Sequence, residues 1–392
     1  AFIDEVYLQQ GSTAGRAMLE TALEHGVAAV ANPPPSLLAL FEDLADTPAW
    51  LDWAEVERGA RAFRRYGTAV FRFAGAVTLE GYAESSVAKP LALTGAYAGA
   101  TTRKRFLETV AFWIAVSDPD GLRPGAAGLA AALRVRMMHV FVRRKVAAHP
   151  EWDTAAWGVP ISQGDALLTL MGGSFAPGVA LHALGYLPSK RDILAMMHFW
   201  RYVGHVLGVR PRWYPSTIRE AMQLSFVTIL KGARTSGEDG IALCQSYAQA
   251  FAPKVTATIA PNPAPPLRAN AQPILSPQSN HHDSTPATAR DRAIALRNRL
   301  RAEWEHRVHL GYTRLFTLPP TYRHNRLPTV NPWFILPLMQ APLRATAEML
   351  RRLVPPLEAV ADRRARAQRS RWFAQQMGER SAEYRPVERM TR

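Results

Sequence analysis

The hydrophobic positions of this chain repeat with the period of a helix. In most segments apolar side chains recur every three or four residues, and no series of segments alternates apolar and polar positions as a half-buried strand would. The strongest helical patterns cover residues 55–66, 103–117, 129–148, 192–207, 217–231, 241–251, 287–310 and 344–377. The pattern predicts an all-α fold. Residues 70–75 alone are compatible with a strand, although their continuation fits a buried helix as well.

Caps and breakers divide these segments. Ser36, Ser162 and Ser189 each precede an apolar-periodic run and are predicted N-caps, because a serine hydroxyl can accept a hydrogen bond from a free backbone N–H of the first turn. Gly208 is predicted to end the helix over 192–207. The proline-rich stretch 318–337 is predicted to be irregular.

Proline content also divides the chain into regions. Residues 253–286 hold many prolines among Asn, Ser and Gln, a composition that predicts an extended surface connector. We therefore expect a helical core over 1–252, the connector, and C-terminal helices over 287–392 that pack on the core as part of one large domain. No window holds about 18 uninterrupted apolar residues, so no transmembrane helix is expected.

Candidate chemistry concentrates in two of the predicted helices. In the first, over 103–117, Arg105, Glu108 and Thr109 are spaced to share one face. In the second, over 129–148, one stripe carries Ala132, Val135, Arg136, His139, Val142 and Arg143. An imidazole among apolar side chains with arginines at the edge suits an axial haem ligand with cations near the two propionates. It equally suits a core histidine with a satisfied hydrogen bond.

Composition and charge narrow the classes of function. The 48% hydrophobic and 20% charged content is ordinary for a globular protein. The formal charge of +15 raises nucleic acid as a partner, but the arginines are spread over many helices and no nucleic-acid-binding motif is present, so none is expected. The single cysteine, Cys244, excludes an internal disulfide and the covalent attachment of a c-type haem.

Several short motifs, in their order, resemble the family of latex-clearing proteins and MpaB-type oxygenases. The run from Arg136 to Arg143 resembles the family's haem-ligand helix, and Arg105 and Thr109 fit its arginine and threonine four positions apart. Other segments that resemble the family lie at 48–50, 93–95, 157–165, 184–185, 200–204 and 207–209. The resemblance extends over about residues 35–215.

This resemblance implies a globin-like helical core that binds one b-type haem without a covalent bond. His139 would be the axial ligand of the iron, and Arg136 or Arg143 would pair with a propionate. Arg105 and Thr109 would steer bound O₂ by hydrogen bonds. The implied reaction is O₂-driven cleavage of carbon–carbon double bonds in an apolar isoprenoid, either polyisoprene or a shorter terpenoid chain.

One position departs from the latex-clearing pattern. Where those relatives carry a lysine that can ligate iron, this chain has Glu108, so a lysine ligand from this position is impossible. An ungapped count places Lys89 where those relatives use a glutamate as base, so the acidic and basic groups would have exchanged places. Glu108 is then the candidate base.

Other functions remain open at this level. A peroxidase or peroxygenase would use H₂O₂ at the same haem, and a non-catalytic haem carrier or sensor would show no turnover. The basic, amphipathic segment 344–377 is either a solvated helix face or a helix that lies on a membrane or another hydrophobic surface. Since the chain begins at Ala1 without an initiating Met, we expect either an exported protein with a removed signal or a cytoplasmic one.

Overall fold

A computed structural model describes residues 1–95, 99–231, 234–253 and 289–377. Every regular element in these ranges is a helix, which confirms the all-α prediction. The α-helices are α1 (Ser12–His25), α2 (Pro35–Ala45), α3 (Trp53–Arg65), α4 (Ala69–Tyr82), α5 (Ser85–Thr94), α6 (Thr102–Ser117), α7 (Ala127–Ala147), α8 (Thr154–Trp157), α9 (Gln163–Gly173), α10 (Phe175–Ala180), α11 (Lys190–Val206), α12 (Ile218–Lys231), α13 (Gly237–Ala248), α14 (Ala289–Phe316), α15 (Pro319–His324), α16 (Ile335–Met339), α17 (Ala341–Leu353) and α18 (Pro356–Met377). Short 3-10 or π turns cover Ile3–Tyr7, Val27–Ala29, Gly99–Thr101, Leu181–Leu184 and Pro332–Phe334.

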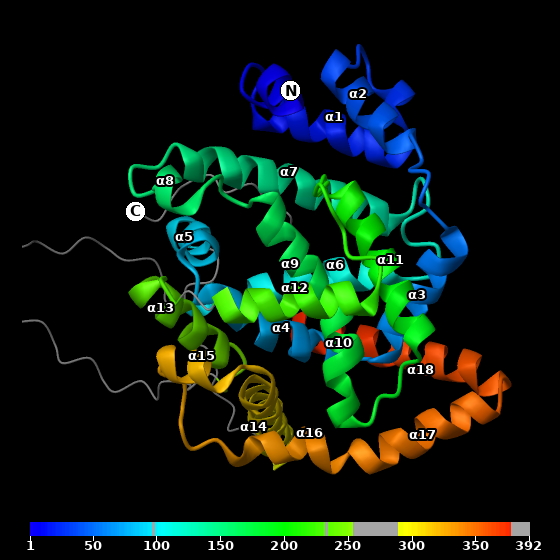
Figure 1. Cartoon of the computed structure of the whole chain (residues 1–392), viewed down its shortest axis with the longest axis vertical. Helices are drawn as coiled ribbons and strands as arrows, with labels where there is room; N and C mark the ends of the chain where they lie inside the picture. Colours follow the sequence, from blue (N-terminus) through cyan, green and yellow to red (C-terminus); the bar gives the residue numbers. More distant parts are fainter. Residues whose placement is uncertain (96–98, 232–233, 254–288, 378–392) are drawn as a thin grey trace, which may run out of the picture.

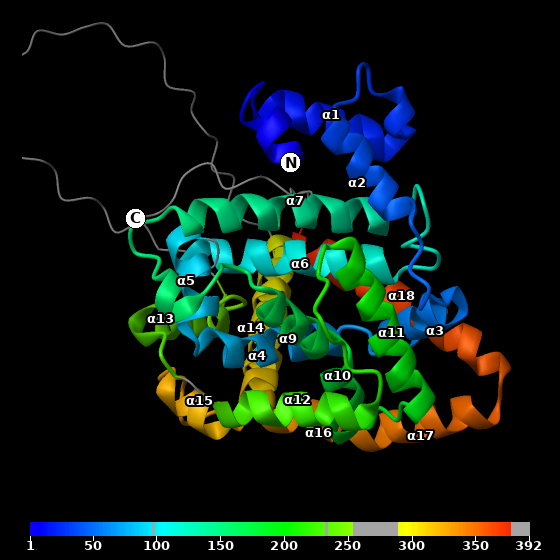
Figure 2. The same cartoon turned by 45° about the horizontal axis from the view of Figure 1, so that its top comes forward.

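Helix α7 separates two apolar clusters of unequal size (Figures 1 and 2). On one side of it, α1, α2 and the first residues of the chain form a small cluster that includes Val6, Leu19 and Leu37, with Met137 of α7. On the other side lies the main core, to which α3, α4, α6, α9 and α11 contribute. Helix α7 therefore has apolar neighbours on opposite faces, and α6 runs beside it.

The closest helix pair in the core is α3 against α11. Gly59 allows this approach, since a Cβ atom built there would lie 2.0 Å from the backbone oxygen of Ala195. Around this point Phe63 of α3 packs against Phe199 and Trp200 of α11 with ring centroids 6.2 and 5.3 Å apart. We call this closely packed pair, α3 and α11, the base of the fold.

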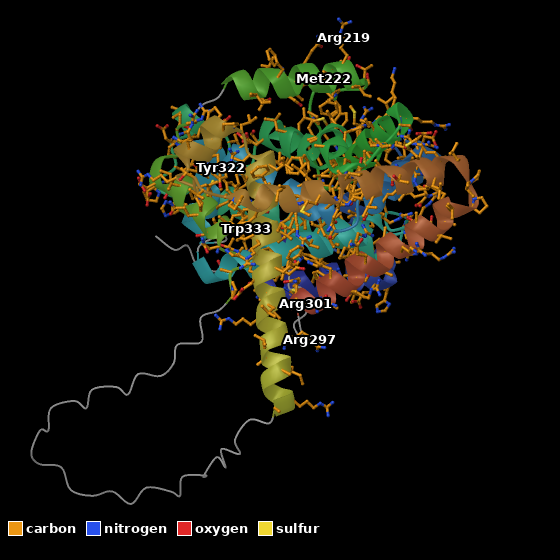
Figure 3. All side chains as sticks on the ribbon, turned by 90° about the horizontal axis from the view of Figure 1, so that it is seen from below. Arg219, Met222, Arg297, Arg301, Tyr322 and Trp333 are labelled. Carbon is orange, nitrogen blue, oxygen red and sulfur yellow. The ribbon has the colours of Figure 1, made fainter. Side chains whose placement is uncertain are left out.

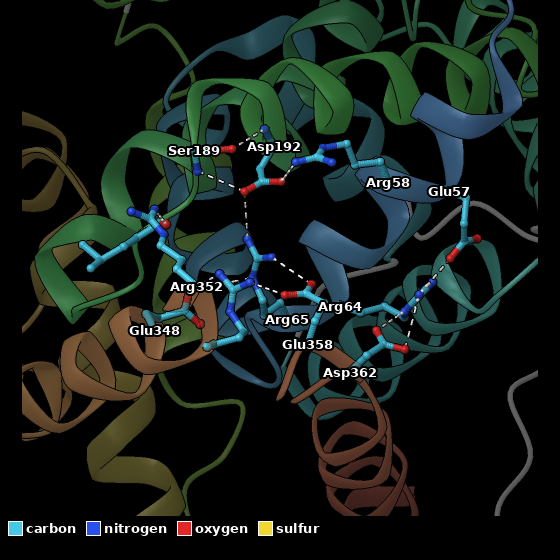
Figure 4. Close-up of polar contacts among 12 residues, drawn as sticks. Glu57, Arg58, Arg64, Arg65, Ser189, Asp192, Glu348, Arg352, Glu358 and Asp362 are labelled. Carbon is cyan, nitrogen blue, oxygen red and sulfur yellow. Dashed lines mark hydrogen bonds and ion pairs between the residues drawn. The ribbon is translucent and has the colours of Figure 1, made fainter. Parts of the chain in front are cut away.

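An ion-pair network joins this base to the C-terminal helices (Figure 4). The guanidinium of Arg65 lies 3.3 Å from Asp192 on α11, 3.4 Å from Glu358 on α18 and 3.8 Å from Glu348 on α17. The neighbouring Arg64, which is almost fully buried, pairs with Asp362 of α18 at 2.8 Å. Segments nearly 300 positions apart in sequence are thereby held together.

Two of the three predicted serine caps are confirmed. The hydroxyl of Ser162 accepts from the N–H of Asp165, and Ser189 forms a reciprocal capping box with Asp192. The prediction for Ser36 is wrong: α2 begins at Pro35, and Ser36 lies inside its first turn with its own N–H bonded to Glu5. Proline suits the first helical position because it has no N–H to leave unsatisfied.

The same property of proline explains a second error. The stretch 318–337, predicted to be irregular, contains α15 and the start of α16, with Pro319 and Pro332 at the first positions of helical turns. Residues 70–75 belong to α4 and are helical, and α13 begins four residues earlier than predicted. The predicted connector 253–286 lies, apart from its first residue, outside the described residues.

One described segment, Gln163–Leu184, is long and apolar enough to cross a membrane by length and composition alone. Such a segment was not expected from the sequence, because no window holds about 18 uninterrupted apolar residues. It is built from α9, α10 and the turn at Leu181–Leu184, and 56% of its apolar window is buried among the other helices. Its contacts with α4 and α11 are those of core helices, so we interpret it as part of the core.

Candidate functional site

The two helices predicted to carry the chemistry lie side by side. Helix α6 ends at Ser117, shortly before Pro119, and the chain turns at Gly121 and Gly125 before α7 begins at Ala127. The guanidinium of Arg105 on α6 lies 3.6 Å from the sulfur of Met138 on α7. Arg105 therefore reaches the residue directly before His139, and the structure brings the two predicted halves of the site together.

His139 lies on the face of α7 that is turned toward the body. Val135, one turn before it, packs on the main core, and Val142, after it, packs in a smaller cluster with Leu93 and Trp152. The side chain of His139 itself is half-buried. Among the described residues none forms a hydrogen bond with its ring.

The environment of His139 keeps the imidazole neutral. Burial, with a smaller contribution from the positive charge of Arg143, lowers the pKa of His139 to about 4. At neutral pH the ring thus offers a lone pair on one nitrogen, which is the form that a metal ligand needs. A neutral imidazole next to the apolar core fits a nitrogen ligand for haem iron.

The polar groups of α6 form a connected cluster. The carboxylate of Glu108, only 5% exposed, accepts a hydrogen bond from Arg105 at 2.8 Å and lies 3.8 Å from the ammonium of Lys104. The hydroxyl of Thr109 donates to the backbone oxygen of Arg105 at 3.1 Å. The predicted face of Arg105, Glu108 and Thr109 exists, and Glu108 holds the guanidinium of Arg105 beside α7.

The two arginines of α7 differ in their partners. Arg136 forms an ion pair with Asp43 of α2 at 3.4 Å, and Asp43 also binds Arg210 at 2.8 Å. Arg143 donates to the backbone oxygens of Pro160 at 3.0 Å and Ile161 at 2.8 Å, and within the described ranges it has no carboxylate partner. Arg136 is therefore balanced by the protein, while the positive charge of Arg143 is not.

Lys89 of α5 has two carboxylate partners. Its ammonium lies 2.7 Å from Glu151 and 3.1 Å from Asp239, on the side of α5 that faces α13 and the turn after α7. The exchange of roles between Lys89 and Glu108 stays a prediction.

A further two residues of this region were not anticipated from the sequence. Met138 had no special signal, because its neighbour His139 defined the stripe and Met138 falls beside it. Asp43 lies 93 positions before Arg136, and no local pattern connects the two. The described residues contain no group of three or more His, Cys, Asp or Glu side chains that could hold a bare metal ion.

Comparison with known proteins identifies the family of this chain. Residues 60–392 match the model described as "ER-bound oxygenase mpaB/B'/Rubber oxygenase, catalytic domain". The chain belongs to this family. The matched range includes both α6 and α7, and the family is the one that the motifs around His139 resemble.

Two individual proteins resemble the chain within this family. A rubber oxygenase from Streptomyces sp. (strain K30) is 27% identical over 189 residues, which cover 47% of this chain and 46% of that protein. The match thus spans about half the length of the relative. The structure of latex clearing protein LCP in the closed state superposes with a TM-score of 0.52 at 18% identity, over 85% of both chains. This likeness shows a shared fold.

Proposed function

We propose that the protein is a haem-b-dependent oxygenase that uses O₂ to cleave carbon–carbon double bonds in an apolar isoprenoid. The observation that carries the proposal is His139, a neutral imidazole on the body-facing side of α7, with Arg105 of α6 held against the adjacent Met138. Membership of the oxygenase family supports the type of reaction. The rubber oxygenase relative supports a polyisoprene-like substrate or a shorter terpenoid.

His139 and Arg143 are the residues that would hold the cofactor. The neutral imidazole would coordinate the iron, and a charge-assisted hydrogen bond from Arg143 would favour a propionate because no described carboxylate competes for this guanidinium. Arg136 is the weaker candidate, since Asp43 already balances its charge. When bound, the haem would supply activation of O₂.

Two residues of α6 would act beside the cofactor: Arg105 would stabilise negative charge and Glu108 would accept a proton. Arg105 presents N–H donors fixed by the carboxylate of Glu108, so its guanidinium needs little reorganisation when negative charge develops near it. Glu108 can also accept a proton from the substrate, because a buried carboxylate near the reacting atoms is a candidate base. These two roles of Glu108, as anchor of Arg105 and as base, make different predictions.

Oxygen uptake by the haem-loaded protein tests the proposal. We expect consumption of O₂ with polyisoprene or a short isoprenoid, and carbonyl products. Arg105→Ala and Glu108→Gln should each lower kcat about a hundredfold or more with haem retained, whereas the exposed Arg299→Ala on α14 should leave it unchanged. If Glu108 is the base, Glu108→Gln also removes the acidic limb of the pH–rate profile. If Glu108 only anchors Arg105, the limb persists.

Two results would contradict the proposal. Turnover that needs H₂O₂ and ignores O₂ would identify a peroxidase or peroxygenase. Haem binding without turnover of any isoprenoid would identify a carrier or sensor.

A further inference from the structure

Helix α17 is packed with its polar side inward. Glu348 and Arg351 are 8% and 9% exposed, although a surface helix of a globular protein normally turns such residues to solvent. On the opposite side Leu343 and Leu353 are each 76% exposed and Leu350 is 54% exposed. The three leucines are spaced seven and three residues apart, so they share one face of the helix.

The ion-pair network around Arg65, the last residue of α3, holds α17 in this orientation (Figure 4). Glu348 lies 2.9 Å from Arg351 and 3.8 Å from Arg65, and Arg351 also binds Glu358 of α18. Rotating α17 to bury its leucines would pull Glu348 and Arg351 out of this network and leave Arg65 with fewer partners in a site that is only 8% exposed. The ion pairs of Glu348 and Arg351 therefore keep the leucine face of α17 turned outward.

The outward apolar face continues beyond α17. On the preceding α16, Ile335 is 52% and Met339 is 68% exposed. Helices α16 and α17 follow each other along one edge of the molecule (Figure 1), and the view from below in Figure 3 shows this edge uncovered by other described elements. We call these exposed residues, Ile335, Met339, Leu343, Leu350 and Leu353, the outer apolar edge. Several large apolar side chains exposed on consecutive helices are typical of an interaction site.

The sequence of α16 and α17 is poor in carboxylates. Between residues 318 and 360 the only carboxylates are Glu348 and Glu358, and both are engaged in the network. Arg344 is turned toward the body, where it donates to the backbone oxygen of Leu184 and lies over the ring of Tyr186. Arg352 is exposed, and in the part of the chain that the structure describes its partner is the backbone oxygen of Leu187 and not a carboxylate.

We propose that the outer apolar edge docks the protein on an anionic lipid bilayer. A helix lying in the bilayer interface presents apolar residues to the acyl chains and basic residues to the phosphate headgroups. On α17 the exposed leucines would supply the first and the exposed Arg352 the second. The formal charge of +15 on the whole chain favours the same anionic surface.

Co-sedimentation of the full chain with vesicles tests this proposal without haem or turnover. We expect binding to phosphatidylcholine vesicles that contain phosphatidylserine, weaker binding to phosphatidylcholine alone, and loss of binding at high salt. The triple variant Leu343→Ser/Leu350→Ser/Leu353→Ser should lower partitioning at least about tenfold. Arg352→Gln should lower it about fivefold on the anionic vesicles only.

A matched variant carries the same changes at exposed leucines away from α17. Leu8→Ser/Leu296→Ser/Leu300→Ser alters residues that are 57–63% exposed and should bind vesicles as the unaltered chain does. Circular dichroism checks that all variants keep their helices. The proposal is overturned if the unaltered chain does not bind anionic vesicles, if the matched variant loses binding equally, or if the leucine variant changes only the oligomeric state in gel filtration.

Discussion

The contact between α3 and α11 gives the most direct prediction of stability. In Gly59→Ala the new methyl group would lie 2.0 Å from the oxygen and 2.5 Å from the carbonyl carbon of Ala195, and 2.7 Å from the Cβ of Phe199. Ordinary contact begins at 3.4 Å, so the nearest atom must move by about 1.4 Å. All three obstacles are backbone or Cβ atoms, and no change of rotamer removes them.

The expected cost follows from this geometry. Overpacking of a core typically destabilises by about 1–3 kcal/mol, and a clash with backbone belongs at the upper end. The higher helix propensity of alanine offsets at most about 1 kcal/mol of this destabilisation. We therefore expect Gly59→Ala to lower the free energy of unfolding by about 2–3 kcal/mol. With about 2.1 cal/mol/K of unfolding entropy per residue, this lowers the Tm of a chain of this size by about 2–4 °C.

Thermal and urea unfolding followed by circular dichroism measure the effect. Gly172→Ala on α9 is the matched control, because its nearest neighbour, a methyl of Val77, is 3.9 Å away, and we expect it to stabilise by about 0.5–1 kcal/mol. If Gly59→Ala is as stable as the unaltered protein, α3 and α11 do not approach each other as described, and the base of the fold must be revised.

Two further predictions concern the C-terminal network and the helix caps. Burial alone would raise the pKa of Asp192, but the charge of Arg65 and the hydrogen bonds from Ser189 outweigh it and hold this pKa below its ordinary 3.8. The resulting stability is complete above pH 3.8 and is lost as the pH falls below it, so Asp192→Asn should cost about 2–3 kcal/mol at pH 7 and flatten the acid limb of a stability–pH curve. An unchanged acid limb in Asp192→Asn would show that other carboxylates govern it. Ser189→Ala should cost about 1 kcal/mol in urea unfolding, whereas Ser36→Ala, at a serine that does not cap a helix, should change stability by less than about 0.5 kcal/mol; equal losses would contradict the assigned cap.

Local patterns predicted the parts of the fold that depend on local physics. The helical period located α6 and α7 within two residues at each end, and the serine before each of α9 and α11 was correctly assigned as a cap. The prediction for Ser36 was wrong because the helix begins one residue earlier, at Pro35, which places Ser36 inside the first turn. The face shared by Arg105, Glu108 and Thr109 follows from the helical period, and the structure adds its direction toward Met138.

Long-range contacts were beyond the reach of the sequence. The apolar period of α17 was visible, and the ordinary expectation buries that face; its outward orientation depends on Arg65, more than 280 positions away. The pairing of Arg136 with Asp43 likewise depends on how α2 lies across α7. The assignment of His139 as a ligand stays a prediction, which its lowered pKa and its position beside the apolar core support.

The absorption spectrum of the purified protein, as isolated and after dithionite, tests the central claim most directly when combined with a pyridine haemochrome assay. We predict a Soret band and a b-type haemochrome at about one haem per chain. We predict loss or a shift of that band in His139→Ala, and no change in His306→Ala, which removes a half-buried histidine on α14. An unaltered Soret band in His139→Ala, or a protein that stays colourless after haem is added, would contradict the account.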